Sequence, residues 1–285
     1  MTDIIAQKIS DWAAKTPDNQ SLSNDKDPSL STTLIHGLSI LDCFKQSGSL
    51  PASRKIAMSN AEISAQLGMN KATVSRLCKT LVSQNYLQKN EAGKFLLAPR
   101  ILALSYPILS SMAWRQRASE LMDGLAQFTQ GNISLGVFSG AETVFIKTTG
   151  ALTNFPHVPE IGMTTPLPET STGRALLSML TPDELEAKLA EIKQSYPEAL
   201  SRYAGEIATA IESCQSRGFC VSFGDWRQTI YGASSPVGRT SDGLCVVISC
   251  GVPSYRSNAD EFEHDLGPRL ATVAENLRLM DIFKT

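Results

Sequence analysis

Basic and small polar residues share one face of the segment between residues 71 and 84. They are Lys71, Ala72, Ser75, Arg76 and Lys79. The opposite face carries Val74, Leu77, Cys78 and Leu81, with Val82 at its edge. At 100° per residue this separation predicts an amphipathic helix. Ammonium and guanidinium groups bind phosphate, and a guanidinium also reads guanine in the major groove, so the exposed face is suited to duplex DNA.

The flanking residues predict the elements that would position this helix. Ser59 and Glu62 form a capping box for a preceding helix, and Gly68 ends it because glycine tolerates a positive φ. Residues 86–89 and 94–97 are expected to form a hairpin whose turn contains Gly93, and Lys94 in its second strand is a further candidate DNA contact. An upstream helix is expected to complete the core through Leu34, Leu38 and Leu41, with Ile40 and Phe44 beside them. This order predicts a winged helix-turn-helix.

The charge distribution favours a winged helix-turn-helix over the alternative, a small helical packing domain with a solvated basic face. Residues 30–100 hold nine Lys and Arg against three Asp and Glu, a net charge of +6. Residues 1–29 and 101–285 carry net charges of −2 and −6. A basic module on an acidic body favours phosphate binding.

Composition limits the remaining possibilities. The 285 residues suffice for two domains, and 42% apolar with 19% charged residues is typical of a soluble globular protein. We expect no membrane helix and no secretion signal. The six cysteines form no CxxC and the three histidines are far apart, so we expect free thiols in a reducing cytoplasm, with no metal and no cofactor.

Two segments outside the module are expected to be helical in part. Residues 1–32 form an N-terminal arm, in which residues 3–15 are either a short amphipathic helix with Ile5, Ile9 and Trp12 on one face or a disordered segment. Residues 16–33 are rich in Ser, Asp, Asn and Pro and indicate a flexible linker. Residues 98–120 suggest one long helix, bent near Pro107, whose broad apolar surface suits a dimer contact.

The chain after residue 119 is expected to be an α+β domain with a central antiparallel sheet flanked by helices. Its expected helices cover residues 120–130, 171–180, 182–194 and 201–217, and a last helix reaches residue 283. Its expected strands cover residues 132–138, 143–147, 219–223, 232–237 and 244–252.

The chain resembles the IclR family of transcriptional regulators over about residues 33–280. The resemblance rests on HGLSILDCF, AEISAQLGMNKATVSRLCKTLVSQNYLQK and GKFLLAPRILAL, and later on TTPLPETSTGRALLSML, SRGFCVSFGDW and ASSPVGRTSDGLCVVISCGVP, in that order. It implies a winged helix-turn-helix at 33–98, a linker helix at 99–118 and a GAF-like effector-binding domain at 119–285. It further implies a homodimer or dimer of dimers on a palindromic operator in double-stranded DNA, and it adds Thr73 to the recognition helix.

The resemblance also implies a pocket for a small-molecule effector. The residues assigned to it are Thr170, Ser171, Thr172, Gly173, Asp225, Trp226, Tyr231, Ser234, Ser249 and Cys250. Free N–H groups at a helix start suit a carboxylate, although simple capping by Thr170 or Ser171 explains the same residues. The aromatic residues Trp226, Tyr231 and Phe223 suit either the walls around a ligand ring or the hydrophobic core. Asp225 either accepts a hydrogen bond from a ligand or pairs with Arg227. Pro168 and Glu169 replace the usual His-Ala, and residues 230–232 also depart from the family pattern.

The sequence therefore predicts a ligand-responsive DNA-binding regulator, a repressor of a catabolic operon whose effector is a small organic acid or an aromatic compound. The alternatives are a GAF-like signalling adaptor that does not bind DNA and an enzyme of unrecognised type. Against an enzyme, the chain has no GxSxG, P-loop, GxGxxG or HExxH motif, and no histidine lies in the pocket segments.

Overall fold

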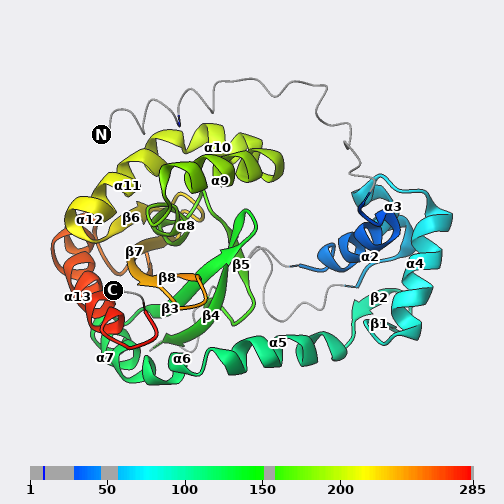
Figure 1. Ribbon diagram of the computed structural model, residues 1–285, viewed down its shortest axis with the longest axis horizontal. Helices are drawn as coiled ribbons and strands as arrows, with labels where there is room; N and C mark the ends of the chain where they lie inside the picture. The colour runs from blue at the N-terminus through cyan, green and yellow to red at the C-terminus, as the bar shows by residue number, and fades with distance from the viewer. Residues whose placement is uncertain (1–8, 10–28, 46–56, 151–157, 284–285) are drawn as a thin grey trace. The chain divides into compact units, whose positions relative to one another are not determined.

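The computed structural model describes residues 9, 29–45, 57–150 and 158–283 of the chain (Figure 1). It divides into two compact units, one spanning Pro17–Ala113 and the other combining Met1–Thr16 with Trp114–Thr285. Each unit has its own hydrophobic core.

The smaller unit is a winged helix-turn-helix, as predicted. It consists of α2 (Thr32–Asp42), α3 (Asn60–Leu67), α4 (Lys71–Ser83) and the hairpin of β1 (Leu87–Lys89) and β2 (Phe95–Leu97). The capping box is present, because the Ser59 N–H donates to Glu62 Oε2 at 2.6 Å and the Glu62 N–H donates to Ser59 Oγ at 3.2 Å. Gly68 ends α3 at φ 62° and Gly93 turns the hairpin at φ 73°.

The predicted apolar face of α2 is wrong in part. Ile40 and Phe44 are buried, but Leu34 and Leu38 are 62% and 53% exposed, and Leu41 is only partly buried. Leu34, Leu38 and Leu41, which follow the i, i+4, i+7 spacing, instead lie beside the face of α2 that packs against α3 and α4. The helix therefore has a second apolar stripe that points away from its own core, made of Leu34, Ile35 and Leu38.

The single helix expected over residues 98–120 is also wrong, because it is broken at Met112 and Ala113. Helix α5 (Arg100–Ser111) contains Pro107 and buries no residue. Two helices of the larger unit follow, α6 (Trp114–Arg117) and α7 (Ser119–Thr129). Trp114 is buried, and buried Arg115 donates to the Ile146 carbonyl at 2.5 Å, so the chain is anchored where the larger unit begins.

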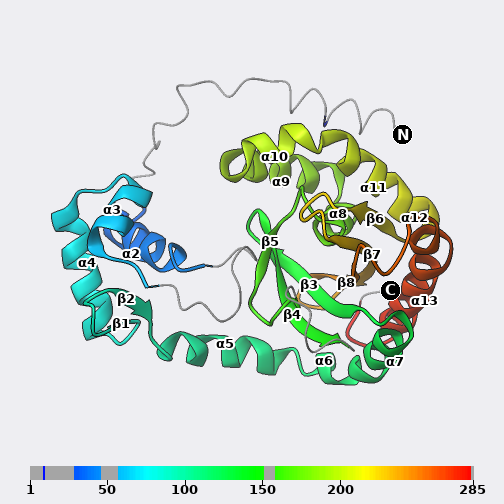
Figure 2. The ribbon, with the colours of Figure 1, turned by 180° about the vertical axis from the view of Figure 1, so that it is seen from behind.

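A six-stranded antiparallel sheet organises the larger unit, in the order β5-β4-β3-β8-β7-β6 (Figures 1 and 2). The strands are β3 (Asn132–Ser139), β4 (Glu142–Gly150), β5 (Thr164–Pro166), β6 (Cys220–Phe223), β7 (Ile230–Arg239) and β8 (Cys245–Pro253). All the predicted strands are present, whereas β5 was not foreseen.

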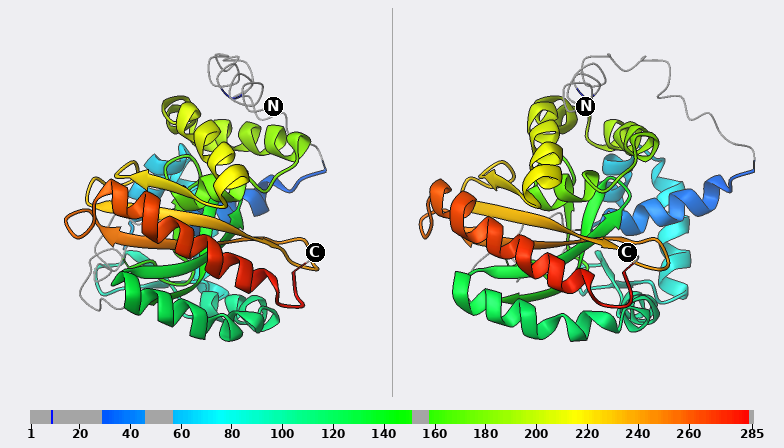
Figure 3. Two further views of the ribbon diagram at one scale, coloured as in Figure 1. Left: turned by 90° about the vertical axis from the view of Figure 1, so that its left-hand side faces the viewer. Right: turned by 60° about the vertical axis from the view of Figure 1, so that its left-hand side comes forward.

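Helices cover both faces of this sheet (Figure 3). Helices α7 and α13 (Gly267–Arg278) lie on one face, and α8 (Ser171–Leu177), α9 (Pro182–Ser195), α10 (Pro197–Arg202) and α11 (Ala204–Arg217) on the other. The helix expected over 201–217 is two helices that meet at Tyr203. The last predicted helix is interrupted, since α12 (Ala259–Glu261) and a π-turn, η1 (Phe262–Leu266), precede α13, which ends at Arg278.

The core of the larger unit includes one residue from the predicted N-terminal arm. Ile9 is helical, is 1% exposed and belongs to the same buried cluster as residues of α8, α9 and α11. Ile5, Trp12 and most of the predicted linker over 16–33 lie outside the described residues.

The cysteine prediction agrees with the structure, in which all six cysteines are buried free thiols. Within the described ranges there is no group of side chains that could hold a metal ion. No described helix has the length and apolar character needed to cross a bilayer.

Candidate DNA interface and effector cavity

Helix α4 presents the predicted basic face to solvent. Lys71, Ala72, Arg76 and Lys79 are exposed and Thr73 and Ser75 are partly exposed, whereas Val74 and Cys78 are fully buried. The turn before α4 is fixed by hydrogen bonds, because Asn60 Nδ2 donates to the Lys71 carbonyl at 3.0 Å and Ser64 Oγ donates to the Met69 carbonyl at 2.5 Å. The core and the turn together hold the basic face in one orientation.

Lys94, the candidate contact in the wing, is already engaged inside the smaller unit. Its Nζ lies 3.1 Å from Oε1 of Glu62, the carboxylate that caps α3. Hydrogen bonds from Ser59 and the nearby Lys94 ammonium lower the pKa of Glu62 to about 2. The carboxylate is therefore charged at neutral pH and partly neutralises Lys94, so this lysine differs from Lys71, Arg76 and Lys79, for which no ion pair is found among the described residues.

One face of the large sheet is polar near α8. Side chains alternate along a strand, so Asn132 and Ser134 of β3 point to the same face. Their register partners in β8 are Gly251 and Ser249, and Ser249 pairs in turn with Ser234 of β7. A strip of small and polar residues therefore crosses three strands, opposite the start of α8.

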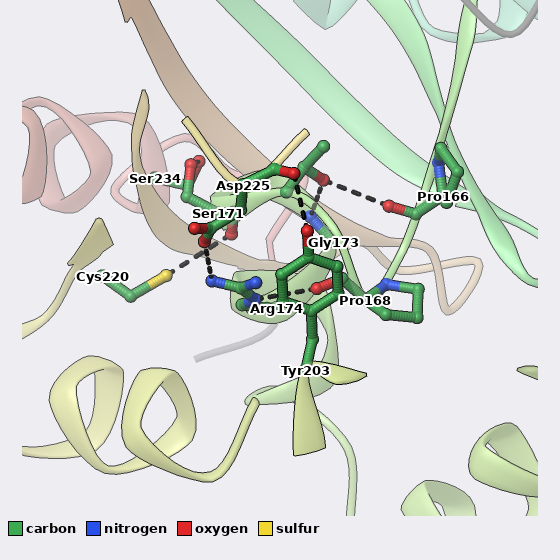
Figure 4. Close-up of polar contacts among 10 residues, drawn as sticks. Pro166, Pro168, Ser171, Gly173, Arg174, Tyr203, Cys220, Asp225 and Ser234 are labelled. Atoms are coloured by element: carbon green, nitrogen blue, oxygen red, sulfur yellow. Dashed lines mark hydrogen bonds and ion pairs between the residues drawn. The ribbon is translucent and has the colours of Figure 1, made fainter. Parts of the chain in front are cut away.

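The start of α8 is bonded to this strip (Figure 4). Ser171 Oγ lies 2.9 Å from Ser234 Oγ, which also donates to Thr172 Oγ1 at 3.3 Å. Thr170 caps the helix, since its Oγ1 accepts from the Gly173 N–H at 3.1 Å. The capping interpretation thus holds for Thr170, while Ser171 and Thr172 use their hydroxyls to dock α8 on the sheet.

A cavity lies between this polar strip, α8 and the segment around Trp226, with about 70 Å³ of space that water centres can reach. Six of the predicted pocket residues line it, namely Thr170, Ser171, Thr172, Trp226, Ser249 and Cys250. The Cys250 thiol is fully buried, and an added Cβ on Gly131 would meet its Sγ at 3.2 Å, so the sulfur lies near the end of α7. Burial raises the pKa of this thiol to about 12.

Gly173, Asp225, Tyr231 and Ser234 do not line the cavity. A side chain on Gly173 would collide with the backbone of Leu167, so glycine is required for the close approach of α8. Tyr231 is partly buried and packs edge-to-face against Phe223 and Phe262, with ring centroids 5.1 and 5.9 Å apart.

Asp225 forms an ion pair with the buried Arg174. Its Oδ2 lies 2.6 Å from Nη1 of Arg174, whose side chain is 2% exposed (Figure 4). Arg174 also donates from Nε to the Pro168 carbonyl at 2.9 Å, and its guanidinium lies 5.2 Å from the Tyr203 ring. This cluster fixes the segment before Trp226 against α8.

Several cavity residues were missed by the sequence reading. They are Asn132, Ser134, Phe145, Pro159, Met163, Thr165, Ser222, Arg227, Ile230, Gly232 and Gly251. Asn132 and Thr165 are each 2% exposed, and Asn132 Oδ1 and Nδ2 and Thr165 Oγ1 have no hydrogen-bond partner among the described residues. The available signal was Asn132 in an otherwise apolar strand, but its pairing with two glycines becomes visible only with the sheet register.

A DNA-binding head joined to a domain with a polar cavity defines a ligand-responsive transcriptional regulator. The model of the IclR helix-turn-helix domain matches residues 33–91, and that of the bacterial transcriptional regulator IclR C-terminal domain matches residues 107–278. The chain therefore belongs to the IclR family. This assigns it to DNA-binding regulators, in place of the enzyme and the adaptor considered above.

Individual relatives agree with this assignment. An IclR family transcriptional regulator from Brucella abortus has a crystal structure with 30% identity and a TM-score of 0.76, covering 90% of this chain and 94% of its own. The HTH-type transcriptional regulator XynR of Escherichia coli K12 is 24% identical over 79% of this chain and 87% of its own length. An IclR homologue from Microbacterium hydrocarbonoxydans, solved with 4-hydroxybenzoate, shares the fold with 19% identity and a TM-score of 0.61, covering 87% of this chain and 99% of its own.

Proposed function

We propose that this regulator is a cytoplasmic repressor of a catabolic operon. A small organic acid or aromatic effector releases it from DNA by binding in the cavity between the polar strip of the sheet and α8. The main support is the cavity itself, in which buried polar atoms of Asn132 and Thr165 face no described partner. The Microbacterium homologue, which holds 4-hydroxybenzoate, offers a precedent for a small ligand in this fold.

The proposed DNA contacts are the exposed residues of α4, with Lys94 in the wing. They are Lys71, Ala72, Thr73, Ser75, Arg76, Lys79 and Lys94. Arg76 is the candidate for reading a base, because it is exposed at the centre of the face. Arg76→Ala is expected to weaken binding to the operator by about 1–3 kcal/mol while changing nonspecific binding less. Equal losses on operator and random DNA would instead assign Arg76 to phosphate.

Two exposed apolar stripes support a homodimer, or a dimer of dimers, on a palindromic operator. One is formed by Leu34, Ile35 and Leu38 of α2, and a second, shorter one by Leu102 and Tyr106 of α5, while Leu104 and Ile108 are exposed on the opposite side of α5. Single exposed apolar residues are ordinary, but contiguous stripes mark association surfaces.

Sedimentation velocity tests this dimer directly. Leu38→Lys is expected to shift the protein toward monomer and to weaken operator binding. Leu279→Lys is the matched control, because Leu279 is 82% exposed at the end of α13 and lies in neither stripe. Unchanged assembly of the Leu38 variant would contradict the assignment of α2 to the dimer contact.

The coupling proposed between the cavity and DNA runs through α5. Helix α5 buries none of its residues and joins the smaller unit to Trp114, the first residue of the larger one. A ligand alters DNA affinity only if it binds one arrangement of the two DNA heads better than another. The test is operator affinity measured with and without a compound whose binding has been established separately. An unchanged affinity would contradict the coupling.

A further inference from the structure

Two buried polar side chains of the cavity, Asn132 and Thr165, have polar atoms without a hydrogen-bond partner among the described residues. Both polar atoms of the Asn132 amide and the Thr165 hydroxyl are without a partner in the described part of the chain, although each residue is only 2% exposed. Burial of an unpaired polar group is costly, and native proteins avoid it. Because both residues line the same cavity, one occupant can satisfy both.

The absence of a side chain at Gly150 leaves the space that the Asn132 amide occupies. Asn132 is paired with Gly150 of β4 on one side and with Gly251 of β8 on the other. A Cβ on Gly150 would collide with Asn132 Oδ1, so the side chain lies over the space that this glycine leaves. The amide offers two donors and an acceptor, and a ligand hydroxyl can satisfy both kinds at once because it donates and accepts.

The charge of the cavity selects an anion. Arg227 is the one charged side chain among the described lining residues, and its guanidinium lies 4.4 Å from the ring of Trp226, which also lines the cavity. Burial lowers the pKa of Arg227, although a guanidinium remains charged at neutral pH. Its planar fork fits a carboxylate.

The walls of the cavity limit the carbon skeleton. Phe145, Met163 and Ile230 supply the apolar surface, and the cavity volume is about 70 Å³. A cavity of this size suits a short chain better than a large ligand. A ring without a hydroxyl, such as that of benzoate, would leave the Asn132 amide unpaired.

From these observations we infer that the effector is a short hydroxycarboxylate, with its carboxylate on Arg227 and a hydroxyl between Asn132 and Thr165. The inference rests on the proposed function, since it assumes that this cavity is the effector site. It narrows that function to one chemical class and sets aside aromatic and unsubstituted acids. It also gives Asn132, Thr165 and Arg227 a role in specificity.

Calorimetric titration of the full-length protein with matched compounds tests the class. Glycerate and threonate carry both groups, propionate and butyrate carry only the carboxylate, glycerol and erythritol carry only hydroxyls, and benzoate carries a ring. Glycerate or threonate is expected to bind at least about tenfold more tightly than the acid or polyol of equal length, as one good hydrogen bond allows. Equal affinities, or no binding of either hydroxy acid, would overturn the inference.

Variants test the residues separately from the fold. Thr165→Val is expected to reduce affinity for the hydroxy acid about tenfold and to leave the weak binding of butyrate unchanged. Thr143→Val is the matched control, because Thr143 is the register partner of Thr165 and is fully buried but does not line the cavity. Its hydroxyl, like that of Thr165, has no hydrogen-bond partner among the described residues. Arg227→Gln should remove the preference for threonate over erythritol. Equal effects of the two threonine variants would refute the assignment.

Operator binding separates this inference from the proposed function. Release of DNA by benzoate or butyrate, but not by threonate, would preserve the function and overturn the inference. Tight binding of threonate without any change in operator affinity would preserve the ligand class and contradict the effector role.

Discussion

The two candidate lysines of the DNA-binding unit should respond differently to replacement. Lys79 is exposed on α4 and has no ion pair with any described carboxylate. Lys94 has its ammonium 3.1 Å from Glu62, whose lowered pKa of about 2 keeps it charged in any neutral buffer. Lys79 therefore brings a full positive charge to phosphate, whereas Lys94 must share its charge with Glu62. We predict that Lys79→Ala weakens DNA binding more than Lys94→Ala does.

The expected size follows from counterion release. Each phosphate neutralised on duplex DNA contributes about 0.9 to the slope of log K against log salt concentration. In the proposed dimer both heads lose a contact, so Lys79→Ala should reduce the magnitude of the slope by about 1.8. Lys94→Ala should reduce it by clearly less, because the Lys94 ammonium is already paired with Glu62 and therefore neutralises less phosphate.

Fluorescence anisotropy with operator DNA over a range of KCl concentrations measures these slopes. Both side chains are outside the hydrophobic core, and the Lys94–Glu62 pair is exposed, so both variants should remain folded, with losses of less than about 1 kcal/mol in the free energy of unfolding. A slope for Lys79→Ala equal to that of the wild type would show that the basic face of α4 does not contact phosphate. A larger change for Lys94→Ala would refute the electrostatic reasoning.

Three further changes probe stability by thermal unfolding. Glu62→Gln should lower the unfolding temperature at pH 6, because the charged carboxylate stabilises the folded state. The pKa of Glu62 is depressed by folding, so this stabilisation is lost as the pH falls from about 4.5 to about 2, and the difference from the wild type should shrink over that range. Gly173→Ala should destabilise by about 1–3 kcal/mol, since the new methyl group meets the backbone of Leu167; an unchanged midpoint would contradict this packing. Asp225→Ala leaves a buried guanidinium unpaired and should cost about 3 kcal/mol, whereas Glu263→Ala, in an exposed ion pair, should cost less than about 1 kcal/mol. Similar costs for the two would contradict the burial argument.

Features encoded by neighbouring residues were predictable from the sequence. The capping box at Ser59 and the glycine that ends α3 are present because their hydrogen bonds join residues three to five positions apart. The two faces of α4 followed from helical periodicity alone. The apolar face of α2 did not, because that helix carries two adjacent apolar stripes and only tertiary packing decides which one is buried.

The cavity was predictable only where one short segment builds it. Thr170, Ser171 and Thr172 are consecutive, and their hydroxyl-rich turn stands out in the sequence. Asn132 and Thr165 come from different strands. Their proximity depends on the register of the sheet and on the short strand β5, which no local sequence pattern predicts. The ion pair between Asp225 and Arg174 joins residues 51 positions apart, so it could not be found from neighbouring residues.

The burial of Ile9 has a consequence for biosynthesis. Its place in the core is built by helices from Ser171 onward, which leave the ribosome long after the N-terminus does. The nascent DNA-binding head, which lies between Ile9 and Trp114, can fold first, while Ile9 stays exposed until translation is nearly complete. In sequence, the DNA-binding head is therefore an insertion within the larger unit.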